Sequence, residues 1–121
     1  MNSLNLVAFD LGASSGRAIL GTLSGDRLTI RPVHQFSNGP VELNGHLFWD
    51  VLKFVSEIKE GLSKASSVAE GPLASLGIDT WGVDYGLLDS SGHLLGVPFH
   101  YRDHRTAGMF DEALRRMEKK Q

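Results

Sequence analysis

The sequence of 121 residues contains no cysteine and little excess of charge of either sign. Without cysteine, the chain cannot form disulfide bonds or thiolate metal sites. Twelve Lys and Arg residues against 14 Asp and Glu residues give a formal net charge of −2, which argues against nucleic acid as a partner. No apolar run approaches the ~20 residues that span a bilayer, and no basic flank with an apolar signal core is present. We therefore expect a cytoplasmic protein without a membrane partner.

The sequence does contain enough apolar residues for a globular domain. The hydrophobic content of 41% is ordinary, and the length alone suggests one domain. The nearly continuous apolar run at 4–9 predicts a strand that is covered on both faces. Runs at 17–23 and 27–31 predict two more strands joined by short turns, and together the three form an antiparallel meander.

A helix is predicted after a loop-like region at 36–45. Its apolar stripe has the spacing i, i+3, i+4, i+7 and i+11, and it consists of Val51, Phe54, Val55, Ile58 and Leu62. Asp50 is the predicted N-cap, and Trp49 is placed for a hydrophobic staple to Phe54. A largely buried strand is predicted at 73–79. The strand–helix–strand order favours a crossover that places it parallel to the first strand.

The remainder of the chain predicts smaller elements. Two short strands are expected at 83–88 and 93–99, on either side of a turn, and the tail at 109–117 has helical periodicity. The fold class predicted from these patterns is α/β, with a mixed sheet that begins with the meander and continues through the helix to a parallel strand.

The first chemical signal is the segment 10–17, DLGASSGR. A tight turn lets successive backbone N–H groups converge on an anion, and the hydroxyls of Ser14 and Ser15 can add donors. Arg17 could bind phosphate oxygens in a fork, and Asp10 could hold a hydrated Mg²⁺. The spacing fits neither a Walker loop nor the dinucleotide fingerprint. The alternative is a hairpin that uses small residues only because its turn requires them.

The second signal is the segment 79–86, DTWGVDYG, at the end of the predicted parallel strand. The carboxyl ends of strands in α/β sheets are where ligands usually bind. Carboxylates and aromatic rings would suit a sugar, since they offer polar groups to its hydroxyls and flat surfaces to its C–H faces. In the alternative, Trp81 and Tyr85 are core or rim residues and Asp84 is a solvated charge.

The third signal is the segment 101–106, YRDHRT. His100 and His104 have the i, i+4 spacing that could bind a metal if this region were helical. No third ligand lies in a suitable frame, so we predict a loop with surface histidines. The two arginines and the aspartate of the segment could equally form a structural ion-pair network.

Together, the three segments resemble the carbohydrate kinases of the FGGY family. The segment 10–17 is similar to the first phosphate motif of that family, and 101–106 is similar to its aromatic-x-Asp-x-Arg-Thr motif. The resemblance implies an actin/hexokinase-like (ribonuclease-H-like) architecture. It also implies that residues 1–121 are the N-terminal part of the first kinase domain, and that the second, C-terminal lobe lies outside this sequence.

The resemblance implies an activity as well, the Mg²⁺-dependent transfer of the γ-phosphate of ATP to a ketose. The segment 78–84, IDTWGVD, favours L-rhamnulose, which would become its 1-phosphate. A fuculose or xylulose type of ketose kinase, and a non-catalytic sugar- or nucleotide-binding module, are the alternatives. The catalytic aspartate and the adenosine pocket of the family belong to the second half of the protein. We therefore expect no catalytic base within this sequence and no activity from this chain alone.

The resemblance assigns binding roles to particular residues. The residues implied to line the ATP phosphates are Ala13, Ser14, Ser15, Gly16 and Arg17. Asp10 is implied to lie near Mg²⁺, through water. The residues implied to bind the sugar are Trp81, Gly82, Asp84 and Tyr101.

Glycerol-type relatives carry an Arg-Glu pair where this chain has Gly82 and Val83, which leaves space for a bulkier deoxy-ketose. Apolar surface that should face the second lobe is expected to favour self-association.

Overall fold

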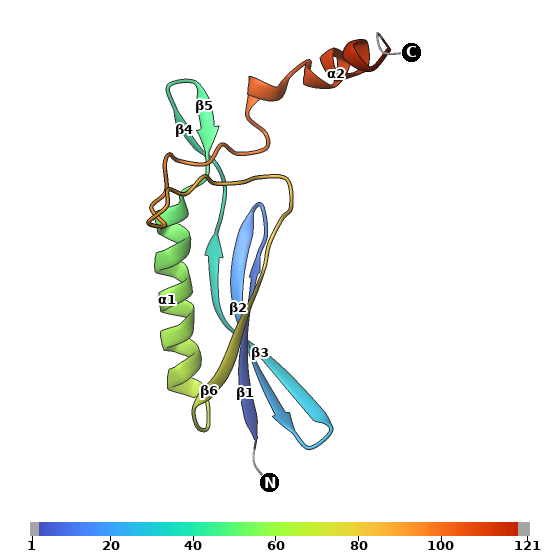
Figure 1. Cartoon of the computed structure of the whole chain (residues 1–121). Coiled ribbons are helices and arrows are strands. Elements are labelled where there is room, and N and C mark those ends of the chain that lie inside the picture. Colours follow the sequence, from blue (N-terminus) through green and yellow to red (C-terminus); the bar gives the residue numbers. More distant parts are fainter. Residues whose placement is uncertain (1–2, 119–121) are drawn as a thin grey trace.

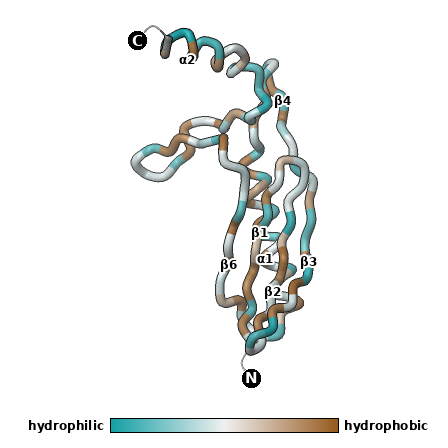
Figure 2. The backbone as a smooth tube through the Cα atoms, turned by 90° about the vertical axis from the view of Figure 1, so that its right-hand side faces the viewer, coloured by the Kyte–Doolittle hydropathy of each residue, from teal (hydrophilic) through white to brown (hydrophobic). Residues whose placement is uncertain are grey.

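The computed structural model describes residues 3–118. Its larger sheet has the strand order β3-β2-β1-β6, as Figures 1 and 2 show. The strands are β1 (Leu4–Leu11), β2 (Ser15–Ser24), β3 (Arg27–Ser37) and β6 (Leu73–Asp79). The first three pair antiparallel, while β6 pairs parallel to β1. The predicted meander and the parallel fourth strand are confirmed.

Helix α1 (Val51–Val68) connects the meander to β6 and lies along one face of the sheet (Figure 1). The side chain of Asp50 accepts a hydrogen bond from the N–H of Lys53 at 3.0 Å, which confirms the predicted N-cap. The rings of Trp49 and Phe54 lie 5.8 Å apart, so the predicted staple contact also forms. Local signals thus set where this helix begins.

The core lies between α1 and the sheet. Val7, Phe9 and Leu11 are buried, whereas the alternate residues of β1 are exposed or half-buried. The prediction that the run at 4–9 is covered on both faces is wrong, because the helix covers one face of the sheet and its opposite face is open. The predicted burial of 73–79 is also wrong. Six of the seven residues of β6 are exposed, because this strand forms an edge of the described sheet.

A hairpin occupies part of the region predicted as loop. Strands β4 (Val41–Leu43) and β5 (His46–Phe48) pair antiparallel. Asn44 and Gly45 connect them with φ angles of 52° and 78°, as a tight two-residue hairpin turn requires. The sequence pattern predicted only a loop-like region here, although an Asn-Gly pair is a strong hairpin signal.

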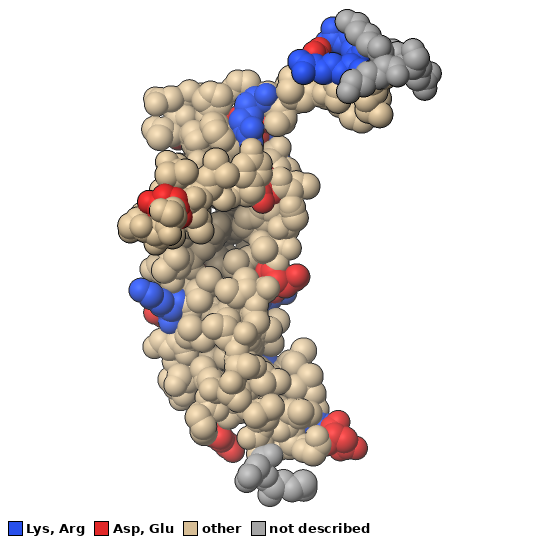
Figure 3. Space-filling view, in the orientation of Figure 1, with Lys and Arg blue, Asp and Glu red and all other residues tan. Residues whose placement is uncertain are grey.

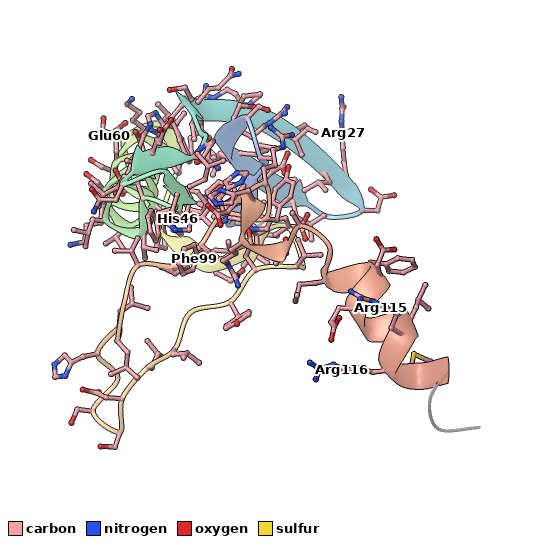
Figure 4. The ribbon with its side chains drawn as sticks, turned by 90° about the horizontal axis from the view of Figure 1, so that it is seen from above. Arg27, His46, Glu60, Phe99, Arg115 and Arg116 are labelled. Atoms are coloured by element: carbon pink, nitrogen blue, oxygen red, sulfur yellow. The ribbon has the colours of Figure 1, made fainter. Side chains whose placement is uncertain are left out.

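The strands predicted at 83–88 and 93–99 are not formed. This region contains only the isolated bridges Leu88↔Leu94 and, to β5, Phe48↔Phe99. Its turn is held locally, because the Asp89 carboxylate accepts hydrogen bonds from the N–H groups of Ser91 and His93. Figure 4 shows this part of the chain extending away from the sheet. Without a neighbouring strand to pair with, its alternating residues stay irregular.

The chain continues through a short 3-10 helix, η1 (His104–Thr106), into α2 (Met109–Glu118). The helix predicted in the tail is therefore confirmed. It points away from the remainder of the molecule (Figure 1), and Phe110 and Met117 on it are exposed.

The face of the molecule in Figure 3 carries few, scattered charges. Among residues 3–118, no helix is long and apolar enough to cross a membrane. Self-association through apolar surface remains a prediction.

Candidate phosphate and sugar site

Two of the three sequence signals meet at one edge of the sheet. Because β1 and β6 are parallel, both strands end at the same edge, and Asp10 is the register partner of Asp79. The turn that follows β1 and the segment that follows β6 therefore begin side by side. This is the edge at which ligands bind in sheets of this class.

The turn after β1 is braced from within and from β3. The N–H of Gly12 donates to the carbonyl of Ser15 at 2.9 Å. Asn38, just past β3, donates from its backbone to the Ser14 carbonyl at 2.9 Å and from its side-chain amide to the Gly12 carbonyl at 2.7 Å. The sequence pattern predicted only that Asn38 lies in a loop-like region. Its bracing role requires the pairing of β2 with β3.

The glycines of this turn are required by close contacts. A Cβ atom on Gly12 would lie 2.9 Å from the Ser15 carbonyl, and one on Gly16 would lie 2.2 Å from the buried Phe36 ring. The alternative that the turn needs small residues for its own packing therefore accounts for Gly12 and Gly16. Within residues 3–118, however, the N–H groups of Ala13 and Ser14 form no hydrogen bond, so both remain available to an anion.

Asp10 and Arg17 lie opposite one another in the β1–β2 register. The Nε atom of Arg17 is 3.3 Å from Asp10 Oδ2, and both side chains are about half exposed. An exposed pair of this kind contributes little to stability. Both charged groups are therefore held beside the turn while they stay accessible to a ligand.

The segment after β6 is organised by a cluster of aromatic rings, the aromatic cluster of Trp49, Trp81, His100 and Tyr101. The ring of Trp49 is buried, and it lies 4.0 Å from the rings of both Trp81 and His100. The ring of Tyr101 stacks on His100 at 4.6 Å. Trp49 thus joins the second and third signals, although its sequence position had predicted only a helix staple.

Asp84 holds the aromatic cluster together. Its Oδ2 atom accepts hydrogen bonds from the indole N–H of Trp49 at 2.5 Å and of Trp81 at 3.2 Å. The same atom accepts the backbone N–H of Tyr101 at 3.2 Å. Asp84 is half-buried rather than a free solvated charge, and one of its oxygens is engaged by three donors.

His100 is buried, so the prediction that it is a surface histidine is wrong. It packs between the rings of Trp49 and Tyr101, a contact that the i, i+4 spacing could not reveal. Burial lowers its pKa, although the nearby Asp84 carboxylate acts in the opposite direction. Its Nδ1 accepts the N–H of Arg102 at 3.0 Å. The proton of the neutral ring therefore resides on Nε2, which has no partner among the described residues.

Asp103 is buried and fastens the third segment to β5. Its carboxylate accepts the N–H of Leu47 at 2.8 Å, the N–H of Arg105 at 2.9 Å and the Nδ1 of His46 at 3.2 Å. Burial raises the pKa of Asp103, but these hydrogen bonds outweigh it and lower the pKa to about 2. The side chain of neither arginine pairs with it. The Arg102 guanidinium lies over the Tyr101 ring, and that of Arg105 lies over Phe99, so the alternative of an ion-pair network among these residues does not form.

Replacing Asp103 by asparagine should change how stability depends on pH. The folded-state pKa of about 2 lies below the ordinary value of 3.8. The stabilisation by this group is therefore present above pH ~4 and lost as the pH falls towards ~2. In urea unfolding measured across pH, Asp103→Asn should be less stable than the wild type at neutral pH and show a shallower loss between pH ~4 and ~2. Asp26→Asn, on the exposed β2–β3 turn, is the control and should retain the wild-type profile.

Two hollows border the aromatic cluster. The first, of about 330 Å³, is lined by residues that include Val83, Asp84, His100 and Thr106. The second, of about 200 Å³, is lined by residues that include Trp81, Tyr85 and Pro98. Gly82 is exposed, and a Cβ atom there would meet nothing within 4 Å. The structure thus brings Trp81, Asp84 and Tyr101 together with open space beside them at Gly82.

The arrangement of these elements matches that of solved sugar kinases. A gluconate kinase from Lactobacillus acidophilus superposes with a TM-score of 0.78 at 14% identity, over 95% of this chain and 23% of that chain. A xylulose kinase from the same organism gives a TM-score of 0.74 at 14% identity, over 93% and 22%. The fold is that of FGGY carbohydrate kinases, so the expected actin/hexokinase-like architecture is confirmed.

Two relatives found by sequence similarity are carbohydrate kinases of one kind. The rhamnulokinase of Mannheimia succiniciproducens is 46% identical over 114 residues, which are 93% of this chain and 23% of that protein. The rhamnulokinase of Pectobacterium atrosepticum is 45% identical over 107 residues, or 87% and 21%. No protein-family model matches. The chain is thus related to the N-terminal region of rhamnulokinases of the FGGY family, and it spans less than a quarter of their length.

Proposed function

We propose that this chain forms the part of the active site that binds the phosphates and the sugar in an ATP-dependent ketose kinase. We propose L-rhamnulose as the ketose. The observation that carries the proposal is the parallel pairing of β1 with β6, which makes Asp10 and Asp79 neighbours. The candidate phosphate turn and the candidate sugar segment start from this one edge. A phosphoryl transfer needs its donor and acceptor to be placed side by side, because catalysis rests mainly on positioning and charge neutralisation.

On the phosphate side, the free N–H groups of Ala13 and Ser14 and the hydroxyl of Ser15 are the proposed donors. Gly16 allows the chain to lie close to Phe36, and Arg17 supplies positive charge. The Asp10 carboxylate fits a hydrated Mg²⁺, because it is a hard oxygen ligand, half exposed, and next to the turn. When bound, Mg²⁺ neutralises charge on the phosphates.

On the sugar side, Trp81 offers its ring, and Gly82 leaves room for the ketose. Tyr101 offers the exposed part of a ring that also contacts His100 and Arg102. Asp84 contributes its Oδ1 atom, since Oδ2 is occupied by the N–H groups of the aromatic cluster. We further propose that residues 1–121 form the N-terminal part of the first kinase domain, and that the second lobe supplies the catalytic base and the adenosine pocket. The cytoplasmic location remains a prediction.

A chimera tests the proposed function. Residues 1–121 would replace the matching region of the M. succiniciproducens rhamnulokinase, to which they are 46% identical. The chimera should phosphorylate L-rhamnulose with MgATP faster than fuculose or xylulose. A folded chimera that phosphorylates no ketose would contradict the kinase assignment. Faster turnover of another ketose would contradict only the assignment of rhamnulose.

Filling the space at Gly82 should impair sugar binding without harming the fold. In the chimera, Gly82→Leu should raise the KM for the ketose at least about tenfold, since the side chain would project into room that the ketose uses. The KM for ATP should change little. Because a Cβ atom at Gly82 meets no protein atom within 4 Å, the melting temperature should also hold. Gly96→Leu, at another uncrowded glycine, is the matched control and should leave both KM values unchanged.

A further inference from the structure

We propose that His46 and His104, oriented by Asp103, bind a transition-metal dication of the Zn²⁺ type, at a site distinct from the one proposed at Asp10. Each of the three residues offers a ligand atom, and these atoms lie within 4.8 Å of one another. The sequence spacing had pointed to His100 with His104, but His100 is buried in the aromatic cluster. The histidine beside His104 comes instead from β5.

The two imidazoles are arranged as a pair. Their rings are nearly parallel, with an interplanar angle of 12° and a centroid separation of 5.0 Å. Because the nitrogen lone pairs lie in the ring planes, the exposed His104 ring has to turn about its side-chain bonds to direct a nitrogen at an ion shared with His46. Figure 4 places His46 close to Phe99. Their ring centroids lie 5.6 Å apart in an edge-to-face arrangement. The side chain of His46 is 40% exposed, and His104 is exposed as well. An ion from solvent can therefore reach both rings, with water filling its other coordination positions.

Asp103 gives this pair the second shell of a metal site. Its carboxylate accepts the Nδ1–H of His46 at 3.2 Å, which fixes the tautomer and leaves the Nε2 lone pair for an ion. The N–H groups of Leu47 and Arg105 hold the carboxylate in place. Hydrogen bonding from a metal-binding histidine to a buried carboxylate orients the ring and makes it a stronger ligand.

The chemistry of the donors selects the class of ion. Imidazole nitrogens suit Zn²⁺, Ni²⁺ and Cu²⁺, whereas Mg²⁺ and Ca²⁺ prefer oxygen ligands. The Arg105 guanidinium, 4.5 Å from the Phe99 ring, is a positive charge in the same neighbourhood and limits the affinity. A bound ion would link β5 to η1, and it would stabilise the folded chain by mass action.

Titration of the full 121-residue chain with Zn²⁺ tests the site, with calorimetry and thermal unfolding as readouts and Mg²⁺ in parallel. The wild type should bind one Zn²⁺ and melt at a higher temperature, with no such response to Mg²⁺. His46→Ala and His104→Ala should each weaken Zn²⁺ binding at least about tenfold, and Asp103→Asn about tenfold. His93→Ala should not weaken it, although His93 also lies beside a carboxylate, that of Asp89, at 3.1 Å.

Three results would overturn the proposal. They are no saturable Zn²⁺ binding to the wild type, wild-type affinity in both histidine variants, or loss of binding in His93→Ala. The circular dichroism spectra of the His46 and His104 variants report whether they stay folded, and both positions are accessible enough for alanine to fit. Because the readout is metal binding and not phosphorylation, the outcome does not depend on the proposed kinase function.

Discussion

Trp49→Ala should lower the free energy of unfolding by about 3–5 kcal/mol, the usual cost of truncating a large buried aromatic residue. Trp49 is 2% exposed, and its ring stacks on Trp81 and packs at a tilt against His100. Its removal would leave a cavity and deprive Asp84 of its shortest hydrogen bond. Urea unfolding followed by circular dichroism measures the loss.

Leu52→Ala is the matched control, because Leu52 lies in the first turn of α1 but is 83% exposed. It should change the free energy of unfolding by no more than about 0.5 kcal/mol. Trp49→Phe, which retains a ring but not the N–H, should lie between the two. The chain has two tryptophans, so this variant leaves Trp81 as the only indole fluorophore and its emission reports whether the segment after β6 stays in place. A Trp49→Ala variant as stable as Leu52→Ala would contradict the central role of this ring.

Arg17→Ala should reduce kcat/KM for ATP in the rhamnulokinase chimera about 10²–10³-fold. That is the typical loss when one donor that stabilises the transition-state charge is removed. Arg17 would face the phosphates from the strand beside the turn, where it now lies 3.3 Å from Asp10. Without the guanidinium, the Asp10 carboxylate would repel the nucleotide. Initial rates measured against ATP at saturating ketose give the effect.

The loss of activity should occur without unfolding. The Arg17–Asp10 pair is about half exposed, so its removal should cost at most about 1 kcal/mol of stability. Arg17→Lys should recover part of the activity, since it restores the charge but not the fork. Arg27→Ala is the control, because Arg27 pairs with Ser24 at the opposite end of the β2–β3 hairpin from the candidate phosphate turn. Unchanged kcat/KM in Arg17→Ala would show that the turn does not bind the phosphates.

Much of the fold was predictable because its signals are local. The cap at Asp50 and the 3.6-residue period of the stripe that begins at Val51 determine α1. Short turns between apolar runs determine the meander, and the crossover rule places β6 beside β1. The errors concern burial and pairing. The outer face of β1 and the edge strand β6 have no covering layer in the described residues, and the alternating segments at 83–88 and 93–99 have no neighbouring strand.

The sequence by itself determined the Ser/Gly turn after β1, the helix α1 and the antiparallel meander, because each depends on residues close together in the chain. Only the tertiary structure decided how the site is held together. Asp84 meets Trp49 across 35 positions, and Asp103 meets Leu47 across 56. Such contacts leave no periodicity or spacing in the sequence. Their partners are chosen by packing, which buries a polar group only where distant segments supply its hydrogen bonds.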